Sequence, residues 1–163
     1  MTYWLGLMSG TSMDAVDAVL VSFTGRHLDI HSTLSLPYPE PLRQRLLLAT
    51  RNQSDTDELG ELDTLVGHHF GHTAKELIRR SGLEIRDIRG IGSHGQTVRH
   101  QPAGPAPFSL KIGNAACIAE STGLTTVSDF RSRDLAAGGQ GAPLVPAFHQ
   151  WLFASDQQDR CIL

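Results

Sequence analysis

The 163-residue sequence lacks the features that mark several large classes of protein. It contains no cluster of Lys and Arg, and its formal net charge is −3, so it lacks the basic surface with which proteins bind a nucleic-acid backbone. No segment reaches the roughly 18 consecutive apolar residues of a membrane span, and no basic region followed by an apolar core and a cleavage site marks the N-terminus. These absences predict a cytoplasmic protein that binds a small molecule, with no nucleic acid and no membrane.

Cysteine is scarce, and common catalytic motifs are missing. Cys117 and Cys161 lie far apart between apolar neighbours, so we expect buried reduced thiols and neither a disulfide nor a zinc knuckle. The sequence has no Gly-x-Ser-x-Gly elbow for a serine nucleophile. Cys117 falls in a predicted apolar helix, which argues against a catalytic thiol.

What the sequence does contain is typical of one globular domain. Hydrophobic residues make up 40% of the chain and charged residues 19%. A chain of 163 residues can bury one sizeable core but is short for two ordinary domains. We therefore expect one domain, or a piece of a larger protein.

The spacing of apolar residues in the first half predicts strands followed by helices. Alternation indicates three strands, at residues 3–8, 15–23 and 27–36. A short helix with Leu46 and Leu47 inward is expected at 42–49. Steps of three and four then indicate an amphipathic helix at 57–81, which Gly82 ends.

The second half alternates between the two kinds of element. A short buried strand that runs into a polar loop is expected at 90–102, followed by strands at 108–112 and 124–128 and helices at 114–121 and about 143–153. Asn114 is the expected cap of the first of these helices. This order predicts an α/β layered fold with a mixed sheet.

The last five residues, DRCIL from Asp159 to Leu163, begin like a buried strand and stop without a turn or a polar tail. We interpret the chain as cut short at Leu163, and the alternative is a genuine terminal strand.

The turn at residues 9–17, SGTSMDAVD, is too long and polar for a plain hairpin. Backbone N–H groups beside Gly10 and the hydroxyls of Thr11 and Ser12 suit a phosphate, and the carboxylates of Asp14 and Asp17 could hold Mg²⁺ through water. It is not a P-loop, because no Gly-Lys-Ser/Thr follows. A long polar hairpin without a ligand is the equal alternative.

Two further polar clusters could bind a ligand. Residues 93–100, SHGQTVRH, follow a short apolar strand, where open α/β sheets form ligand crevices; they could bind sugar hydroxyls, but the sequence alone slightly favours a solvated loop. Asp129, Arg131, Arg133 and Asp134 precede a glycine-rich stretch, and arginine can clamp a carboxylate or a phosphate. The alternative for the second cluster is an internal ion-pair turn.

A metal site on the long helix is the weakest hypothesis. His68 and His72 lie one helical turn apart, but no Glu stands between them as in zinc proteases, and no third ligand is evident. Both fall on the polar face, so we expect solvated histidines.

Four segments in order, LGLMSGTSMDAVDAVLV, SHGQTVRHQP, FSLKIGN and DFRSRDLAAGGQGAPLVPAFH, closely resemble the N-terminal half of the anhydro-N-acetylmuramic acid kinases. The resemblance implies a ribonuclease-H-like lobe of the actin-like ATPase superfamily: a mixed sheet with helices on both faces, incomplete here. Residues 1–163 would form the N-terminal lobe of a two-lobe kinase, with the second lobe absent.

The resemblance also implies site residues and cofactors. ATP phosphates would contact residues 10–17, that is Gly10, Thr11, Ser12, Met13, Asp14, Ala15, Val16 and Asp17, with Asp14 and Asp17 near Mg²⁺. The sugar site would draw on Gln96, Thr97 and Arg131. Ala15 stands where the family usually has Gly, which matters only if that position needs a positive φ.

The implied reaction joins phosphorylation of the sugar O6 to addition of water at the anomeric carbon, giving N-acetylmuramic acid 6-phosphate for cell-wall recycling. The family's general base is the Asp of an Asp-Thr-Gly-Pro-Gly-Asn segment, which this sequence lacks. The base is therefore expected beyond Leu163, so the catalytic residue is unknown and the fragment alone should be inactive.

The full-length protein is expected to be a homodimer, and an exposed sheet edge at Cys161 to Leu163 should favour pairing of chains. The alternative function is a non-catalytic module that binds a sugar or a nucleotide.

Overall fold

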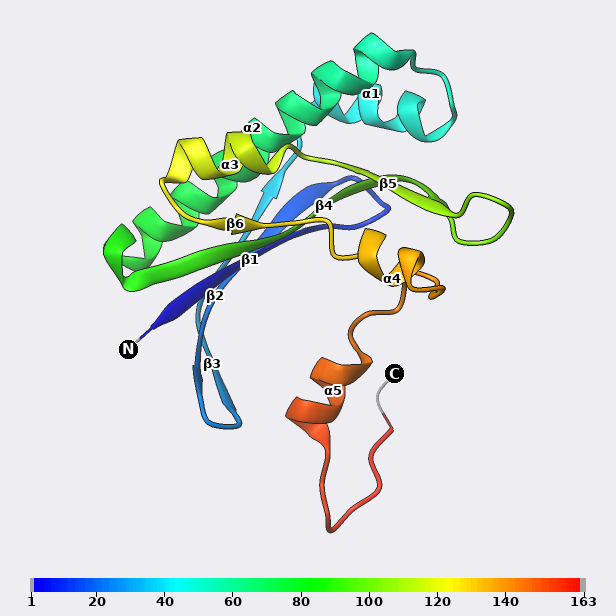
Figure 1. Ribbon diagram of the computed structural model, residues 1–163. Coiled ribbons are helices and arrows are strands. Elements are labelled where there is room, and N and C mark those ends of the chain that lie inside the picture. The colour runs from blue at the N-terminus through cyan, green and yellow to red at the C-terminus, as the bar shows by residue number, and fades with distance from the viewer. Residues whose placement is uncertain (1, 162–163) are drawn as a thin grey trace.

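The computed structural model describes residues 2–161 as one sheet with helices around it (Figure 1). The strands are β1 (Tyr3–Ser9), β2 (Ala15–Thr24), β3 (His27–Pro37), β4 (Ile88–Gln101), β5 (Phe108–Ile112) and β6 (Thr126–Val127). The helices are α1 (Glu40–Thr50), α2 (Thr56–Ser81), α3 (Ala115–Thr122), α4 (Ser132–Ala136) and α5 (Pro146–Phe153), with a 3-10 turn at Ile85–Asp87.

The sheet is mixed, as the order of elements predicts. Its strands lie in the order β3-β2-β1-β4-β5, and β6 also pairs with β4. β1 runs antiparallel to β2 and parallel to β4, while β4 runs antiparallel to β5 and parallel to β6. β5 and β6 therefore pair with different halves of the same long strand.

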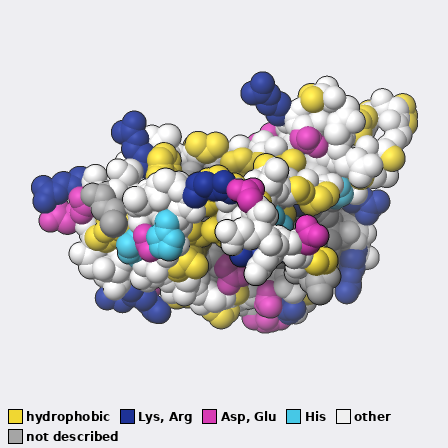
Figure 2. All heavy atoms as spheres, turned by 90° about the horizontal axis from the view of Figure 1, so that it is seen from below, with side chains coloured by type: hydrophobic (Ala, Val, Ile, Leu, Met, Phe, Trp, Pro, Cys, Tyr) yellow, Lys and Arg dark blue, Asp and Glu magenta, His cyan; other side chains and the backbone are white. Residues whose placement is uncertain are grey.

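The hydrophobic core lies on one face of the sheet, under α1, α2 and α3 (Figure 1). Leu5, Leu7 and Leu20 from the strands meet Phe70 and Leu77 of α2, and all five are buried. We expected helices on both faces. Among the described residues the opposite face is covered less completely: α4 contacts β5, Phe130 lies over Gly92 just before α4, and α5 contacts the β2–β3 hairpin. Seen from below, this side of the molecule exposes hydrophobic side chains among polar and charged ones (Figure 2).

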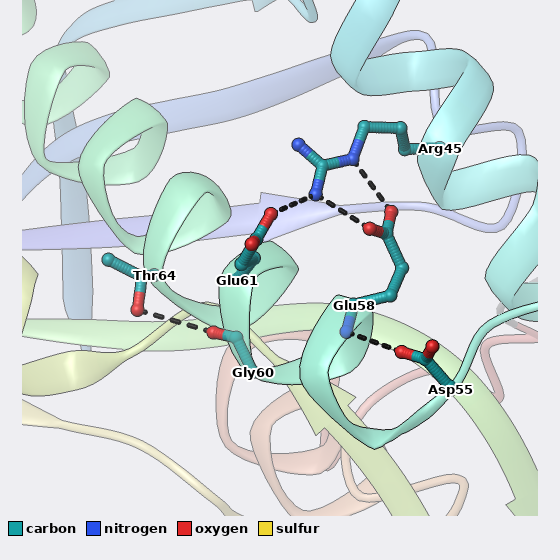
Figure 3. Close-up of polar contacts among 6 residues, drawn as sticks. All are labelled: Arg45, Asp55, Glu58, Gly60, Glu61 and Thr64. Carbon is teal, nitrogen blue, oxygen red and sulfur yellow. Dashed lines mark hydrogen bonds and ion pairs between the residues drawn. The ribbon is translucent and has the colours of Figure 1, made fainter.

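The long helix ends where Gly82 predicts and begins one residue after a capping aspartate. The Asp55 side chain accepts a hydrogen bond of 2.8 Å from the Glu58 N–H, and Gly82 ends the helix in the left-handed conformation. Arg45 of α1 makes two parallel hydrogen bonds to Glu58, of 2.7 and 2.8 Å, and a third to Glu61 (Figure 3). These contacts fix α1 against the start of α2.

The prediction of a polar loop after residue 90 is wrong. β4 continues for 14 residues to Gln101, because pairing with β5 satisfies the backbone of the polar segment. The strand is irregular at Gly95, which has a φ of +68° and whose missing Cβ would lie 2.7 Å from the carbonyl oxygen of Ile112. Glycine is therefore required where β4 passes from β1 to β5.

Other expectations need smaller corrections. β6 covers only Thr126–Val127 of the expected 124–128, the charged segment after it contains the unexpected α4, and α5 begins at Pro146. Cys117 is partly exposed and Cys161 is exposed, so the expectation of two buried thiols is wrong. None of the described helices combines the length and apolar character needed to cross a bilayer.

The terminal segment differs from the strand that its sequence predicts. Residues 159–161 form no strand, which corrects the expectation of a buried strand beginning at Asp159. Ile162 and Leu163 lie outside the described residues, so the part of the prediction that falls on them, including a sheet edge reaching Leu163, stays a prediction.

Candidate functional site

The β1–β2 turn, residues 10–14, is a compact polar turn closed by a hydrogen bond of 3.3 Å from the Met13 N–H to the Gly10 carbonyl. Met13 has a φ of +53°, and its side chain is only 3% exposed, so it anchors the turn in the core. Ala15 does not have a positive φ, so alanine in place of the family's glycine causes no strain there.

Gln96 of β4 holds this turn in place. Its Nε2 donates to the Gly10 carbonyl at 3.1 Å and to the Thr97 carbonyl at 3.2 Å. Its Oε1 accepts a hydrogen bond of 2.7 Å from the Ser9 hydroxyl and a longer one, of 3.5 Å, from Tyr38. The side chain is fully buried, and every donor and acceptor of its amide is used. We expected Gln96 to contact the sugar, and that contact stays a prediction.

The outer side of the turn is exposed and rich in donors. Thr11 and Ser12 are exposed, and no described residue accepts a hydrogen bond from the backbone N–H of either. The Ser12 hydroxyl donates to Asp14 Oδ1 at 2.6 Å, and the Ala15 N–H donates to the same oxygen at 3.1 Å. These hydrogen bonds, chiefly that of Ser12, hold the pKa of Asp14 below its ordinary value of 3.8. The turn thus offers free donors beside an ionised carboxylate.

The remaining expected phosphate-site residues are divided between the two faces of β2. Val16 is fully buried against the helices, so only its backbone could meet a ligand. Asp17 is exposed on the opposite face, near Met8 and Ser35. Asp14 lies in the turn and Asp17 within β2, so the two proposed metal carboxylates belong to different elements.

His94 and Arg131 meet on the face opposite α2. The His94 Nδ1–H donates to the Gly95 carbonyl at 3.0 Å, and Nε2 accepts from Arg131 Nη2 at 3.1 Å. Burial, with a contribution from the Arg131 charge, lowers the pKa of His94 below 6.5. The ring is therefore neutral at pH 7, which is the state that this arrangement requires, since a protonated Nε2 could not accept from Arg131.

Thr97 lies on the same face as His94. Side chains alternate along a strand, and after the irregularity at Gly95 it is Gln96 that faces the core and Thr97 that faces away. Thr97 pairs with Lys111 across β4 and β5, and His100 pairs with Ser109. We call Thr97, His100, Ser109 and Lys111 the polar platform. A cavity of about 480 Å³ opens beside it between the ends of β5 and β6, lined by residues that include Asp63, His94, Ser109, Lys111, Asn114 and Asp129.

The charged residues of the third sequence cluster do not all face the candidate site: one shapes the glycine-rich segment, and one reaches β4. Asp134 accepts a hydrogen bond of 2.7 Å from the Gly141 N–H and packs against Gly139, so it shapes the glycine-rich segment. Arg133 is exposed, and Asp129 accepts from the Ser132 hydroxyl at 2.7 Å. Only Arg131 of this cluster reaches the β4 residues, and no ion pair forms within the described cluster.

The histidine hypothesis gains no support. His68 and His72 are both exposed on α2, as their place on the polar face predicts. Residues 2–161 contain no group of three or more His, Cys, Asp or Glu side chains placed to hold a metal ion.

Sequence reasoning missed Tyr38, Ser109 and Lys111. Tyr38 contacts Gln96 from a distant part of the chain, and nothing in the local sequence indicates that. Ser109 and Lys111, however, alternate with apolar residues in FSLKI, and that pattern could have placed both on one face of a strand.

Comparison with known proteins gives a consistent result. The model of the family described as anhydro-N-acetylmuramic acid kinase matches residues 2–163. A protein of that name from Xanthomonas oryzae pv. oryzae is 48% identical over 165 residues, and one from Vibrio vulnificus is 45% identical over 161. Each alignment covers 98% of this chain and 44% of the relative, so the chain spans less than half the length of these curated relatives.

Proposed function

The chain belongs to the anhydro-N-acetylmuramic acid kinase family, and from that premise we propose that the natural protein containing it phosphorylates 1,6-anhydro-N-acetylmuramic acid with ATP. Water adds to the anomeric carbon, the bond from that carbon to O6 breaks, and O6 takes the γ-phosphoryl group, giving N-acetylmuramic acid 6-phosphate and ADP. The observation that carries the proposal is the exposed, donor-rich β1–β2 turn held by buried Gln96.

In this proposal the turn binds the ATP phosphates. The free N–H groups of Thr11 and Ser12 and their hydroxyls would donate to phosphate oxygens. Asp14 fits a role beside Mg²⁺, because it is ionised and its Oδ2 accepts no hydrogen bond from any described residue. Mg²⁺ would offset the phosphate charge, with Asp14 and, from β2, Asp17 holding it through water.

The sugar would bind against Thr97 and Arg131 on the face opposite α2. The Thr97 hydroxyl has no hydrogen-bond partner in the described part of the chain, and neutral His94 orients the Arg131 guanidinium. Gln96 holds the turn in position, so we propose that it also contributes to ATP binding, beside the sugar contact that the resemblance implies.

The proton released from water needs a general base. The family segment that supplies this base, Asp-Thr-Gly-Pro-Gly-Asn, does not occur in these 163 residues, so we propose that the base follows Leu163 in the natural protein. Residues 1–163 should then release little or no ADP by themselves, because the reaction requires further residues of the natural protein. Because it consumes ATP, we place the reaction in the cytoplasm.

A coupled ADP-release assay with 1,6-anhydro-N-acetylmuramic acid tests the proposal. We expect sugar-dependent ADP release from the natural protein and almost none from residues 1–163. No ADP release from the natural protein would contradict the proposed kinase activity and favour a non-catalytic sugar- or nucleotide-binding module. Efficient ADP release by the 163-residue chain would contradict the proposal that the general base lies outside it. Light scattering tests the proposed homodimer, and a monomer at high concentration would contradict it.

A further inference from the structure

Unsatisfied polar atoms are concentrated on the polar platform. Among the described residues, six buried side-chain polar atoms have no hydrogen-bond partner. Four of them belong to the platform: Thr97 Oγ1, His100 Nδ1, Ser109 Oγ and Lys111 Nζ. Buried polar groups are almost always paired in native proteins, so a group of neighbouring exceptions on one face indicates a place where a ligand completes the hydrogen bonds.

Lys111 is the least well satisfied of the four. Its side chain is 6% exposed, and the nearest carboxylate oxygen, Asp129 Oδ1, lies 3.8 Å from Nζ, beyond hydrogen-bond range. The ammonium also lies 5.7 Å from the centre of the Phe130 ring, a contact that compensates only part of the lost hydration. A buried ammonium without a hydrogen-bonded anion is costly, so the position favours an anionic ligand.

The two carboxylates that line the cavity do not fill this role. Asp63 accepts from the Gly113 N–H at 2.8 Å and from Asn114 Nδ2 at 3.0 Å, so its oxygens are engaged on the α2 side. Asp129 is more than half exposed and already accepts from Ser132. An anion in the cavity could approach Lys111 and Ser109 together, because they are two residues apart on the same face of β5.

The geometry favours a sugar carboxylate over a nucleotide phosphate. The β1–β2 turn is bound through Gln96, whose side chain faces the helices, whereas Thr97 and Lys111 point to the opposite face. We propose that Lys111, aided by Ser109, binds the carboxylate of the acidic amino sugar and so selects it over a neutral anhydro sugar. This inference rests on the proposed function.

The test compares two sugars and two lysines in the natural protein. Calorimetry would give dissociation constants for 1,6-anhydro-N-acetylmuramic acid and for neutral 1,6-anhydro-N-acetylglucosamine. For Lys111→Gln we expect affinity for the acidic sugar to fall about 10- to 100-fold, the usual size for a charged hydrogen bond, with affinity for the neutral sugar unchanged. Lys75→Gln, at an exposed position on α2, is the matched control and should change neither. Lys111→Arg should restore part of the preference.

Other outcomes separate the two proposals. Equal weakening for both sugars, or no change in their ratio, would overturn the role of Lys111 while leaving the kinase intact. A selective rise in the KM for ATP would assign Lys111 to a phosphate instead and would also overturn it. If the unmodified protein binds neither sugar and releases no ADP, the proposed function fails and this inference fails with it. Thermal unfolding of each variant checks that it is folded.

Discussion

The β1–β2 turn and the polar platform are both polar, but their hydrogen bonds differ. Gln96, which holds the turn, uses every donor and acceptor of its amide within the protein. On the platform, the Thr97 hydroxyl and the Lys111 ammonium are buried without a hydrogen-bond partner among the described residues. Gln96 and Thr97 are adjacent in sequence, so the difference arises from the face of β4 to which each side chain points.

Under the proposed function, this difference separates a preorganised part of the site from a part that a ligand would complete. A turn that is already fixed can present its donors to phosphate without an ordering cost during the reaction. Unpaired groups on the platform lower the stability of the protein without ligand, and binding recovers that free energy. Substitutions on the two sides of β4 should therefore change stability in opposite directions.

The largest effect is expected for Gln96→Leu. The substitution removes the hydrogen bonds of a fully buried amide to Ser9, Gly10 and the Thr97 carbonyl, so we expect the free energy of unfolding to fall by about 3 kcal/mol. Urea unfolding measures this. Gln101→Leu, at the exposed end of the same strand, should stay within about 0.5 kcal/mol of the parent. Equal effects at the two positions would show that Gln96 does not brace the turn.

Thr97→Val should have the opposite sign. Valine has nearly the shape of threonine and removes a buried hydroxyl that has no partner, so we expect the free energy of unfolding to rise by about 1 kcal/mol while sugar affinity falls. The matched control is Thr122→Val, because the Thr122 hydroxyl donates to Ile118 and accepts from the Leu124 N–H. We expect the control to lose about 1 kcal/mol. A stability loss at Thr97 would remove the contrast between the two faces.

The sequence predicts the two regions unequally. The turn can be predicted because its glycine, hydroxyls and carboxylates lie close together in the sequence, and the long helix because its apolar spacing and Gly82 are local signals. The platform cannot be predicted from the sequence, because it depends on the register of β4 against β5 and on the irregularity at Gly95. The same holds for Gln96, whose partner Gly10 lies 86 residues earlier in the chain.

A smaller effect concerns the pH dependence of His94. Its pKa is depressed by burial and by the nearby Arg131 charge, so the neutral ring contributes stability that is fully present above pH 6.5 and is lost as pH falls through the depressed pKa. Arg131→Gln should raise the pKa of His94 only part of the way, because the ring stays buried. NMR titration of the ring measures it. Arg133→Gln, at an exposed neighbouring arginine, should leave it unchanged. A His94 pKa that does not respond to Arg131 would disprove the pairing.

The smallest effect is expected at the exposed tip of the turn. The Ser12 hydroxyl is the main cause of the lowered pKa of Asp14, so Ser12→Ala should raise that pKa toward 3.8. An NMR titration of the carboxyl carbon measures the change, and Ser35→Ala, exposed on β3, is the control.

The stability linked to ionised Asp14 is present above pH 3.8 and is lost as pH falls through the lower folded value, and solvent keeps it small. Because Asp14 stays ionised at neutral pH in both proteins, any loss of ATP affinity in Ser12→Ala would come from lost donors and carboxylate orientation. An unchanged Asp14 pKa would mean that the turn is less preorganised than its hydrogen bonds indicate.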